Sequence, residues 1–366
     1  MKRLLSFYRT GLLSFLLVFS IPGMGQGDGG PAHQTRQSRP ILLGVSGGNV
    51  RDRTLLFCCS GTLGALVNRG GQLEVLSNNH VLALSNKGSA GDDIDQPGLI
   101  DVECQVISGD IVADLSWFKP IRFGLLKTNK IDAATAAIRE GQVSTNGSIL
   151  DIGQPSSTIV NPVIGMEVKK SGRTTGLTTG TISDINVTAI LPYPLKCSPR
   201  SRTRIARFVG QFLITPGTFS AGGDSGSLIV ENVANCPRPV GLLVAGSSTA
   251  TLANKISDVL SASGATIVGC ASISDEAAAG GAPKVNEQEL QAAMAVQRRH
   301  EDALMAIPGV VGVGIGRSAA TGRLVLRVYL EQMTPEIEQA IPQAIEGLSV
   351  EKVVTGPFEV RICEGP

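Results

Sequence analysis

The chain has 366 residues, which corresponds to two or three folded domains with room for a sizeable core. Hydrophobic residues make up 42% and charged residues 17%, which excludes a broadly disordered chain, and a net charge of +1 gives no global field for binding nucleic acid. Aromatic residues are scarce at 4% while glycine numbers 44, a composition typical of short strands joined by tight turns. We therefore expect a globular, β-rich protein with no nucleic-acid partner.

Residues 1–25 have the pattern of an export signal. Met1-Lys2-Arg3 is basic, Leu12 to Ile21 is mostly apolar, and Gly23-Met24-Gly25 supplies small residues for cleavage. The apolar stretch is shorter than the roughly 20 residues that span a bilayer. We expect cleavage near Gln26, export to the periplasm or the extracellular space, and no transmembrane segment after signal removal.

The cysteine content fits an oxidising compartment. Seven cysteines are present, so at least one is unpaired within a monomer, and their pairing cannot be deduced from the spacing. None has a nearby histidine that would complete a common zinc pattern, and we predict no metal. The cysteines are Cys58, Cys59, Cys104, Cys197, Cys236, Cys270 and Cys363.

A β-rich domain over residues 41–270 follows a polar, glycine-rich leader that we expect to be loose over 26–40. Short β-type runs separated by Gly, Asn, Ser and Pro predict β-barrels or sandwiches. These runs are Thr62–Val67, Leu73–Ser77, Gly180–Ala189, Phe208–Ile214, Ser227–Val230 and Val240–Ala245.

After an alanine- and glycine-rich linker at 271–286, the pattern changes to that of a separate small α/β module over 287–366. Gly312, Gly314 and Gly316 do not have the spacing of a dinucleotide loop, so we interpret them as sites of close backbone packing. The expected elements are helices at Glu287–Ala306 and Pro335–Ala344 and strands at Gly309–Gly316, Arg323–Leu330 and Val350–Val354.

The strongest chemical signal is the run Gly222-Gly223-Asp224-Ser225-Gly226-Ser227. Glycines that flank a serine allow a tight turn which exposes the hydroxyl and aims backbone N–H groups at one point, as an oxyanion hole requires. The alternative is an ordinary turn between strands, because these residue types also favour turns.

A serine nucleophile needs a base, and histidine is the usual one at neutral pH. The chain has three histidines. His33 lies in the leader and His300 in the C-terminal helix, whereas His80 follows an apolar strand in the β-rich domain. His80 is therefore the predicted base for Ser225.

At this point the sequence resembles a known family. Leu63–Val67 with Ser77–Val81, and Gly223–Ser227 further on, are similar to the histidine and nucleophile segments of trypsin-like serine proteases. Lys170–Gly176 followed by Gly180–Ile182 is similar to the RSGxTTG and GTI segment of streptogrisins and α-lytic protease. The resemblance implies a two-barrel, chymotrypsin-like fold.

More closely, four runs together resemble trypsin-like bacterial proteins related to the plant NARROW LEAF 1 protein. They are CCSGTLGALV, LSNNHVLA, KSGRTTGLTTGT and FSAGGDSGSL. The resemblance covers Leu42 to Ile267 and leaves the C-terminal module outside it.

The third member of a triad must be a carboxylate that orients the imidazole. Asp132 precedes small apolar residues in NKIDAA and is similar to the family's aspartate, while Asp114 in VADL is the competitor. We favour Asp132, with His80 and Ser225 as its partners.

The resemblance also implies the surroundings of the triad. The N–H groups of Gly223 and Ser225 would form the oxyanion hole, Val244-Ala245-Gly246 would pair with the substrate backbone, and Phe219 would lie at the base of the primary pocket. An aromatic base offers a buried cation no countercharge, which argues against cleavage after Arg or Lys. Asp224 needs a neutralising partner, and Lys170 is the first candidate and Arg173 the second.

The sequence therefore predicts an exported serine endopeptidase that acts on polypeptides through an acyl-enzyme without a cofactor. The alternatives are a catalytically silent protease-like scaffold that binds peptides or proteins, and an esterase that uses the same triad. The basic run Pro199–Arg207 is interpreted as a solvated loop or strand face, with recruitment of an acidic partner as the alternative.

Overall fold

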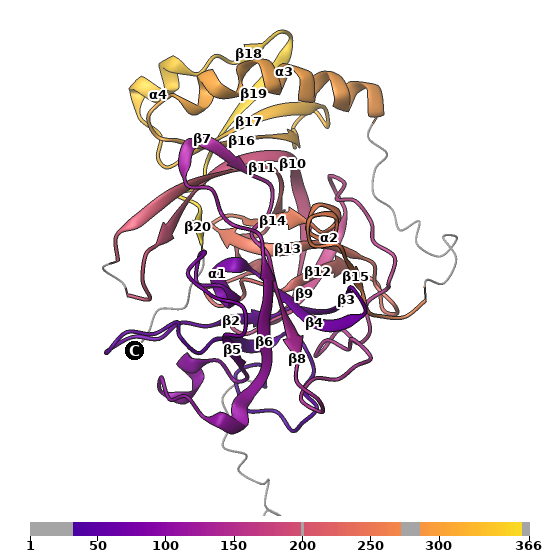
Figure 1. Cartoon of the computed structure of the whole chain (residues 1–366). Helices are drawn as coiled ribbons and strands as arrows, with labels where there is room; N and C mark the ends of the chain where they lie inside the picture. The colour runs from indigo at the N-terminus through magenta and orange to yellow at the C-terminus, as the bar shows by residue number, and fades with distance from the viewer. Residues whose placement is uncertain (1–31, 199–200, 272–285, 361–366) are drawn as a thin grey trace, which may run out of the picture.

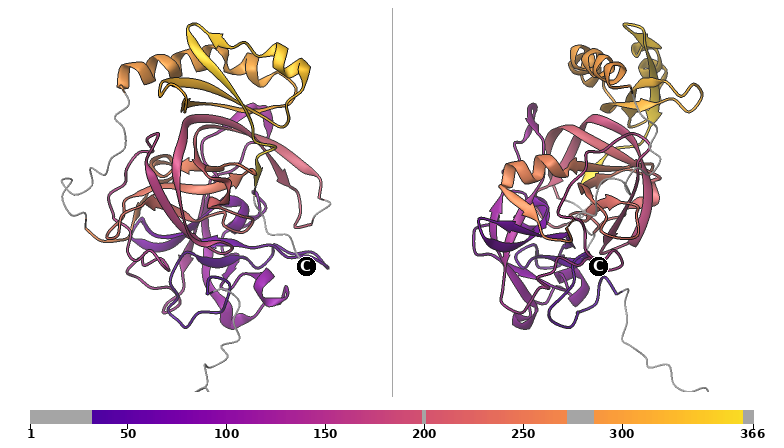
Figure 2. Two further views of the ribbon diagram at one scale, coloured as in Figure 1. Left: turned by 180° about the vertical axis from the view of Figure 1, so that it is seen from behind. Right: turned by 90° about the vertical axis from the view of Figure 1, so that its right-hand side faces the viewer.

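The computed structural model describes residues 32–198, 201–271 and 286–360. Its strands form two sheets, and the C-terminal module lies at one end of the molecule, where its strands extend the second sheet (Figures 1 and 2). The expected export signal, most of the linker and Cys363 lie outside the described residues.

The first sheet has eight strands in the order β15-β3-β4-β8-β6-β5-β1-β2. All of its pairs are antiparallel, and three of the seven, β1–β2, β3–β4 and β5–β6, join strands that are neighbours in sequence. Its strands are β1 Val45–Asn49, β2 Gly61–Leu63, β3 Ala65–Arg69, β4 Gln72–Ser77, β5 Asp93–Asp95, β6 Ile111–Phe118, β8 Ala134–Ile138 and β15 Ala265–Ile267.

The second sheet continues from the β-rich domain into the C-terminal module, in the order β18-β19-β17-β16-β10-β9-β12-β13-β14-β11-β7 with β20 on β13. Its strands in the β-rich domain are β7 Gly124–Asn129, β9 Glu167–Gly172, β10 Gly176–Pro194, β11 Thr203–Thr215, β12 Leu228–Glu231, β13 Pro239–Gly246 and β14 Thr251–Lys255. The module adds β16 Val310–Arg317, β17 Leu324–Leu330, β18 Ala344–Ile345, β19 Leu348–Val354 and β20 Glu359–Val360.

Helices are few and short apart from one in the module. They are α1 Asn79–Leu82, α2 Ile256–Ser263, α3 Glu287–Met305 and α4 Pro335–Ala340, with 3-10 turns at Leu99–Val102, Ser108–Asp110 and Gly217–Phe219. Asn286 caps α3, because its side chain accepts from the N–H groups of Gln288 and Glu289. None of the described helices is long and apolar enough to cross a membrane.

The predicted fold class, a two-barrel chymotrypsin-like domain followed by a small α/β module, is confirmed. The runs expected as strands and helices are found with shifts of a few residues at their ends. The main difference is in length, because β10 runs unbroken for 19 residues where the sequence indicated a shorter strand.

The sequence predicts a module that packs separately, but in the structure the module shares a sheet and a core with the β-rich domain. Strand β16 pairs with β10 from Asp184↔Gly316 to Ala189↔Gly312, and apolar side chains of both parts share one core cluster. The predicted boundaries at 270 and 287 stay a prediction. The close packing expected for the glycines is confirmed, since a Cβ on Gly312 would lie 2.7 Å from the carbonyl oxygen of Thr188.

The expectation of a loose leader is wrong for the described residues 32–40. His33 is only 6% exposed and shares a 2.9 Å hydrogen bond with Ser171, and Arg36 makes two hydrogen bonds to the Asp110 carboxylate. These contacts are long-range in sequence, so local composition did not indicate them.

Three disulfides join Cys58 to Cys104, Cys59 to Cys197 and Cys236 to Cys270. The second disulfide joins Cys59, just before β2 of the first sheet, to Cys197, just after β10 of the second sheet. Disulfides of this kind fit a protein that matures in an oxidising compartment.

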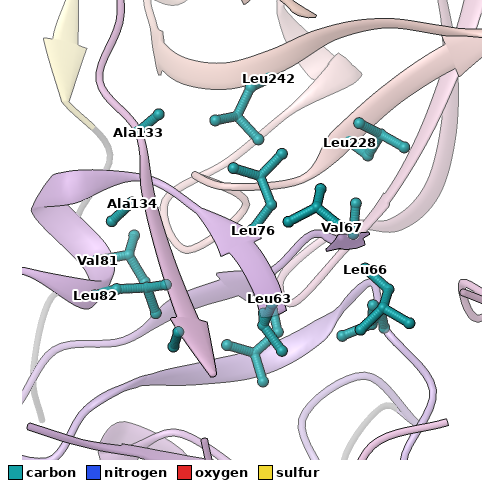
Figure 3. Packing of buried hydrophobic residues seen from close by; sticks show 14 of the residues in the cluster. Leu63, Leu66, Val67, Leu76, Val81, Leu82, Ala133, Ala134, Leu228 and Leu242 are labelled. Atoms are coloured by element: carbon teal, nitrogen blue, oxygen red, sulfur yellow. The ribbon is translucent and has the colours of Figure 1, made fainter. Parts of the chain in front are cut away.

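The two sheets meet in a continuous core. Figure 3 shows Leu228 and Leu242 from the second sheet beside Leu63, Val67 and Leu76 from the first. The same core contains Val81 and Ala133, which are the neighbours in sequence of His80 and Asp132. Burial of these flanking side chains fixes the two polar residues at the junction of the sheets.

Candidate active site

His80 lies on the short helix α1, directly after strand β4, and is 2% exposed. Its Nδ1 lies 2.6 Å from Asp132 Oδ2, and its backbone N–H donates to Asp132 Oδ1 at 3.2 Å. One carboxylate thus holds both the ring and the main chain of the histidine, which leaves Nε2 as the ring nitrogen available for chemistry.

Asp132 is fully buried before β8, and neighbouring polar groups fix its position. Its N–H donates to Asn254 Oδ1 at 2.8 Å, its carbonyl accepts from Asn78 Nδ2 at 2.7 Å, and its Oδ2 accepts from the Tyr193 hydroxyl at 2.8 Å. The competitor Asp114 is engaged elsewhere, in hydrogen bonds of 2.7 and 3.1 Å from Arg139. The structure therefore brings Asp132, and not Asp114, to the imidazole.

Tyr193 is a site residue that the sequence did not indicate. It comes from β10, its ring lies 6.1 Å from that of His80, and it stacks on Phe208 at 6.0 Å. Burial, followed by the charge and hydrogen bond of Asp132, raises the pKa of the Tyr193 hydroxyl well above its usual value. The hydroxyl therefore stays protonated and keeps donating to the carboxylate.

We expect Tyr193→Phe to lower kcat/KM for a peptide substrate by roughly tenfold, because one hydrogen bond to a buried carboxylate is removed. The packing against Phe208 is retained, so the melting temperature should change little. Steady-state kinetics beside thermal unfolding of both proteins measure this. An unchanged kcat/KM would mean that Tyr193 has no part in orienting Asp132.

Ser225 lies in the tight turn between the 3-10 turn at Gly217–Phe219 and strand β12. Gly223 and Gly226 have φ values of +95° and +94°, which only glycine adopts readily. A Cβ on Gly226 would lie 2.1 Å from Ser77 Oγ and 2.4 Å from the Thr62 carbonyl oxygen, so the turn is pressed against β4 and β2. The glycines thus let the serine approach the segment that carries His80.

The Ser225 hydroxyl donates to the Val244 carbonyl at 3.3 Å, while His80 Nε2 makes no hydrogen bond within the described part of the chain. The backbone of Ser225 lies close to the segment of His80: Thr62 N–H donates to the Ser225 carbonyl at 2.9 Å, and a Cβ on Gly61 would lie 3.0 Å from that carbonyl oxygen and 2.5 Å from the side chain of Val81. Rotation about the Cα–Cβ bond of Ser225 is the motion that would turn its hydroxyl towards another acceptor.

Asp224 is completely buried beside Ser225 and is neutralised inside the protein. Lys170 Nζ lies 3.5 Å from its Oδ2, and the carboxylate also accepts from the N–H groups of Thr174 at 2.8 Å and Ala221 at 2.9 Å. Arg173, the second candidate, instead forms a paired hydrogen bond with Asp101 at 2.5 and 2.8 Å. Burial lowers the pKa of Lys170, and Asp224 opposes that shift.

Phe219 is 1% exposed and belongs to the core cluster of the second sheet. The Lys170 ammonium lies 5.9 Å from its ring centroid, and Thr178 Oγ1 donates to its carbonyl at 2.7 Å. The ring of Phe219 itself carries no negative charge, and the ammonium beside it is paired with Asp224.

The segment expected to pair with substrate, Val244-Ala245-Gly246, is the end of β13. One of its edges pairs with β14, and on the other Ala245 and Gly246 pair with Val360 and Glu359 of β20. The sequence did not indicate that the chain itself supplies this partner.

The basic run also finds partners in the same chain. Arg207 donates to Glu301 at 2.6 Å and to Asp302 at 2.7 Å on α3, and the Arg204 guanidinium lies 4.1 Å from the Phe123 ring centroid. Part of the positive charge is therefore used to hold the module helix.

A cavity of about 730 Å³ opens beside His80, between segment 51–57 and residues 194–198. Asp52 lines it, and burial raises the pKa of that carboxyl to about 6 from its usual 3.8, an effect opposed by His80 and Lys87. Asp52, Cys59 and Cys197 lie close enough together for a metal site, but the two cysteines are joined in a disulfide and offer no thiolate.

We expect Asp52→Asn to flatten the pH dependence of stability. Since the folded state holds the Asp52 proton more tightly than the unfolded chain, the stability from this group is present below about pH 4 and is lost as the pH rises through about 6. Between pH 4 and pH 8 the wild type should lose about 2 kcal/mol of unfolding free energy relative to the variant. Urea unfolding of both proteins tests this, and parallel pH profiles would refute it.

Comparison with known proteins gives a family match and several similar structures. Residues 126–262 match the family model described as the Nal1 C-terminal domain. No curated protein matches the chain. Similar solved structures include a glutamic acid specific serine protease, with 22% identity over 62% of this chain and 100% of that chain at a TM-score of 0.41.

Two further similar structures come from bacteria. Protease A of Thermobifida fusca is 18% identical over 63% of this chain and 99% of that chain, with a TM-score of 0.40. A chymotrypsin of Cellulomonas bogoriensis is 16% identical over 63% and 99%, with a TM-score of 0.39. The motifs, the two-sheet architecture and the Nal1 C-terminal domain over 126–262 thus agree on a chain that resembles the trypsin-like bacterial proteins related to NARROW LEAF 1.

Proposed function

We propose that the protein is an exported serine endopeptidase in which His80, Asp132 and Ser225 form the catalytic triad. The observation that carries the proposal is the buried 2.6 Å contact between His80 Nδ1 and Asp132 Oδ2, beside a glycine-framed serine. A buried carboxylate fixes the tautomer that has its lone pair on Nε2 and stabilises the imidazolium formed when Ser225 loses its proton.

In this mechanism the Ser225 hydroxyl turns from the Val244 carbonyl to His80 Nε2 and attacks the peptide carbonyl as the proton passes to the imidazole. His80 then returns that proton to the leaving amine, and water later releases the acyl group by the same route. No cofactor takes part in these steps.

The oxyanion would be held by the N–H groups of Gly223 and Ser225. The two other amides of this turn are used within the protein, since Asp224 N–H donates to the Ala221 carbonyl at 3.1 Å and Gly226 N–H to the Leu243 carbonyl at 3.0 Å. The neutralised Asp224 supports this arrangement, because its side chain ties the turn to the segment of Thr174 and Lys170.

Export is supported by the basic and apolar pattern of residues 1–25 and by the three disulfides. The substrate class that fits this proposal is an extended polypeptide, which would pair antiparallel with the end of β13 in the place that β20 occupies here.

A second candidate is the protease-like scaffold that binds peptides without cleaving them. The observation in its favour is that Ala245 and Gly246 already pair with β20. Incubation of the protein without residues 1–25 with a denatured protein, followed by mass spectrometry of the products, separates the two. New termini that depend on Ser225 support the peptidase, and an intact substrate supports the scaffold.

For specificity, we expect little cleavage after Arg or Lys in a peptide library. Phe219 supplies no countercharge for a substrate cation, and the Asp224 carboxylate close by is already paired with Lys170. Product sequencing measures the preference directly. A strong preference for basic residues on the acyl side would show that the pocket base lies elsewhere.

A further inference from the structure

We propose that the edge of β13 at Ala245–Gly246 is a peptide-binding site that the chain's own C-terminal segment, Phe358–Val360, occupies in competition with substrate. This inference rests on the proposed function for the meaning of "substrate", but the binding that it asserts does not require catalysis. Three features of the described residues carry it: the edge, the anchor and the direction of the strand.

The edge is the one that faces Ser225. Strand β12 covers β13 only as far as the pair Leu228↔Leu242, and the Ser225 turn continues with the bond from Gly226 N–H to the Leu243 carbonyl. Beyond that point the same edge would be open, because β14 lies on the opposite side. An open edge of this kind binds extended peptides through main-chain hydrogen bonds.

Strand β20 fills that edge although it comes from the far end of the chain. It pairs antiparallel, with Gly246 opposite Glu359 and Ala245 opposite Val360 (Figure 1). Within the described part of the chain, which stops at residue 360, two residues belong to the strand. Pairing over two residues has little stability of its own, so other contacts are needed to hold the segment in place.

The anchor is Phe358, which is completely buried. Its ring lies 5.9 Å from that of Tyr329 in an edge-to-face contact, and it belongs to the same apolar cluster as Val244. Ser248 Oγ also donates to the Thr355 carbonyl at 3.2 Å. The segment thus follows β19, packs against Tyr329 of the module through Phe358 and pairs with β13 beside the candidate active site.

The chain direction of β20 matches the direction that a substrate would need on the side of the cleaved bond that forms the acyl-enzyme. From Glu359 to Val360 the segment runs past Gly246 and then Ala245, towards Val244, whose carbonyl accepts from the Ser225 hydroxyl. A peptide that runs this way brings its carboxyl side towards Ser225. Because the segment is tethered, its effective concentration at the edge is in the millimolar range, which would exclude a free peptide at micromolar concentration.

The test is binding of a fluorescein-labelled synthetic peptide with the sequence of residues 355–360, measured by anisotropy. All proteins are full-length and carry Ser225→Ala, so that turnover cannot interfere. The test variant is Phe358→Ala with Val360→Pro, which removes the anchor and one strand N–H. The matched control is Glu359→Gln, because the Glu359 side chain is exposed.

We expect the test variant to bind the peptide at least about tenfold more tightly than the control. Hydrogen exchange should show loss of protection at 244–247 in the test variant, with protection at 239–242 unchanged. Equal affinities would overturn occupation in cis and leave β20 as a tether of the module. Binding by neither protein would overturn the peptide site itself.

Loss of hydrogen-exchange protection throughout the test variant would mean that it has failed to fold. In that case the single variant Val360→Pro, which keeps Phe358, is tested by the same anisotropy and hydrogen-exchange measurements. Whether the protein hydrolyses peptides is measured separately, in proteins that keep Ser225. Absence of turnover in the Val360→Pro protein together with peptide binding would reject the peptidase and retain the inference.

Discussion

Ser225→Ala should lower kcat for peptide hydrolysis by about 10⁵-fold, because it removes the atom that forms the acyl-enzyme. The hydroxyl makes a 3.3 Å hydrogen bond to the Val244 carbonyl, so its loss should change the melting temperature by a few degrees at most. Stopped and continuous peptide assays give the rate, and thermal unfolding gives the stability.

Ser227→Ala is a suitable control for that experiment. Ser227 is equally buried two residues away, and its Oγ donates to the Asp224 carbonyl at 2.7 Å. It should affect stability more than rate. Comparable activity in wild type and Ser225→Ala would exclude the covalent mechanism.

Asp132→Asn should lower kcat by about 10⁴-fold, since an amide at this position favours the wrong tautomer of His80. The variant keeps the size of the side chain and can still accept from the Tyr193 hydroxyl, so the fold should persist. The rate is measured in the same peptide assay, from pH 6 to pH 9.

The matched control is Asp114→Asn, which removes the carboxylate that the sequence left as a competitor. Asp114 is bound to Arg139 and lies away from the imidazole, so activity should stay within about twofold of wild type. If Asp114→Asn proved the more damaging change, the assignment of Asp132 would have to be withdrawn.

The sequence indicated those parts of the candidate site that depend on local backbone geometry. The turn around Ser225 needs glycine at two positions with positive φ, and the GDSG run has glycine at both of them, Gly223 and Gly226. His80 was indicated by elimination among three histidines. Asp132 was favoured because it resembles the family's aspartate, and the structure places it on the ring.

Residues that reach the site through pairing of distant strands could not be predicted in this way. Tyr193 contacts Asp132 only because β10 and β11 extend as a long antiparallel pair past Phe208, and nothing around Tyr193 in the sequence marks it as polar-facing. The same holds for Glu359 and Val360, whose short strand exists only against β13.

The module shows a further limit of local patterns. Its two helices and the strands β16, β17 and β19 follow from periodicity, but the short strands β18 and β20 and the register of β16 against β10 do not. Arg327 illustrates this, because it donates to Asp184 of β10 at 3.0 Å across a sequence separation of 143 residues. Removal of the module by truncation within the linker would therefore expose the edge of β10 and leave Asp184 without Arg327.

The measurement that tests the central claim most directly is labelling with a serine-directed fluorophosphonate, followed by mass spectrometric mapping of the modified residue. The protein without residues 1–25 is compared with its His80→Ala variant, and a known serine protease serves as the positive control. We expect one phosphonylated residue, Ser225, in the wild type and at least about 100-fold slower labelling in the variant. Absence of label on Ser225 under conditions that fully modify the control protease would contradict the account.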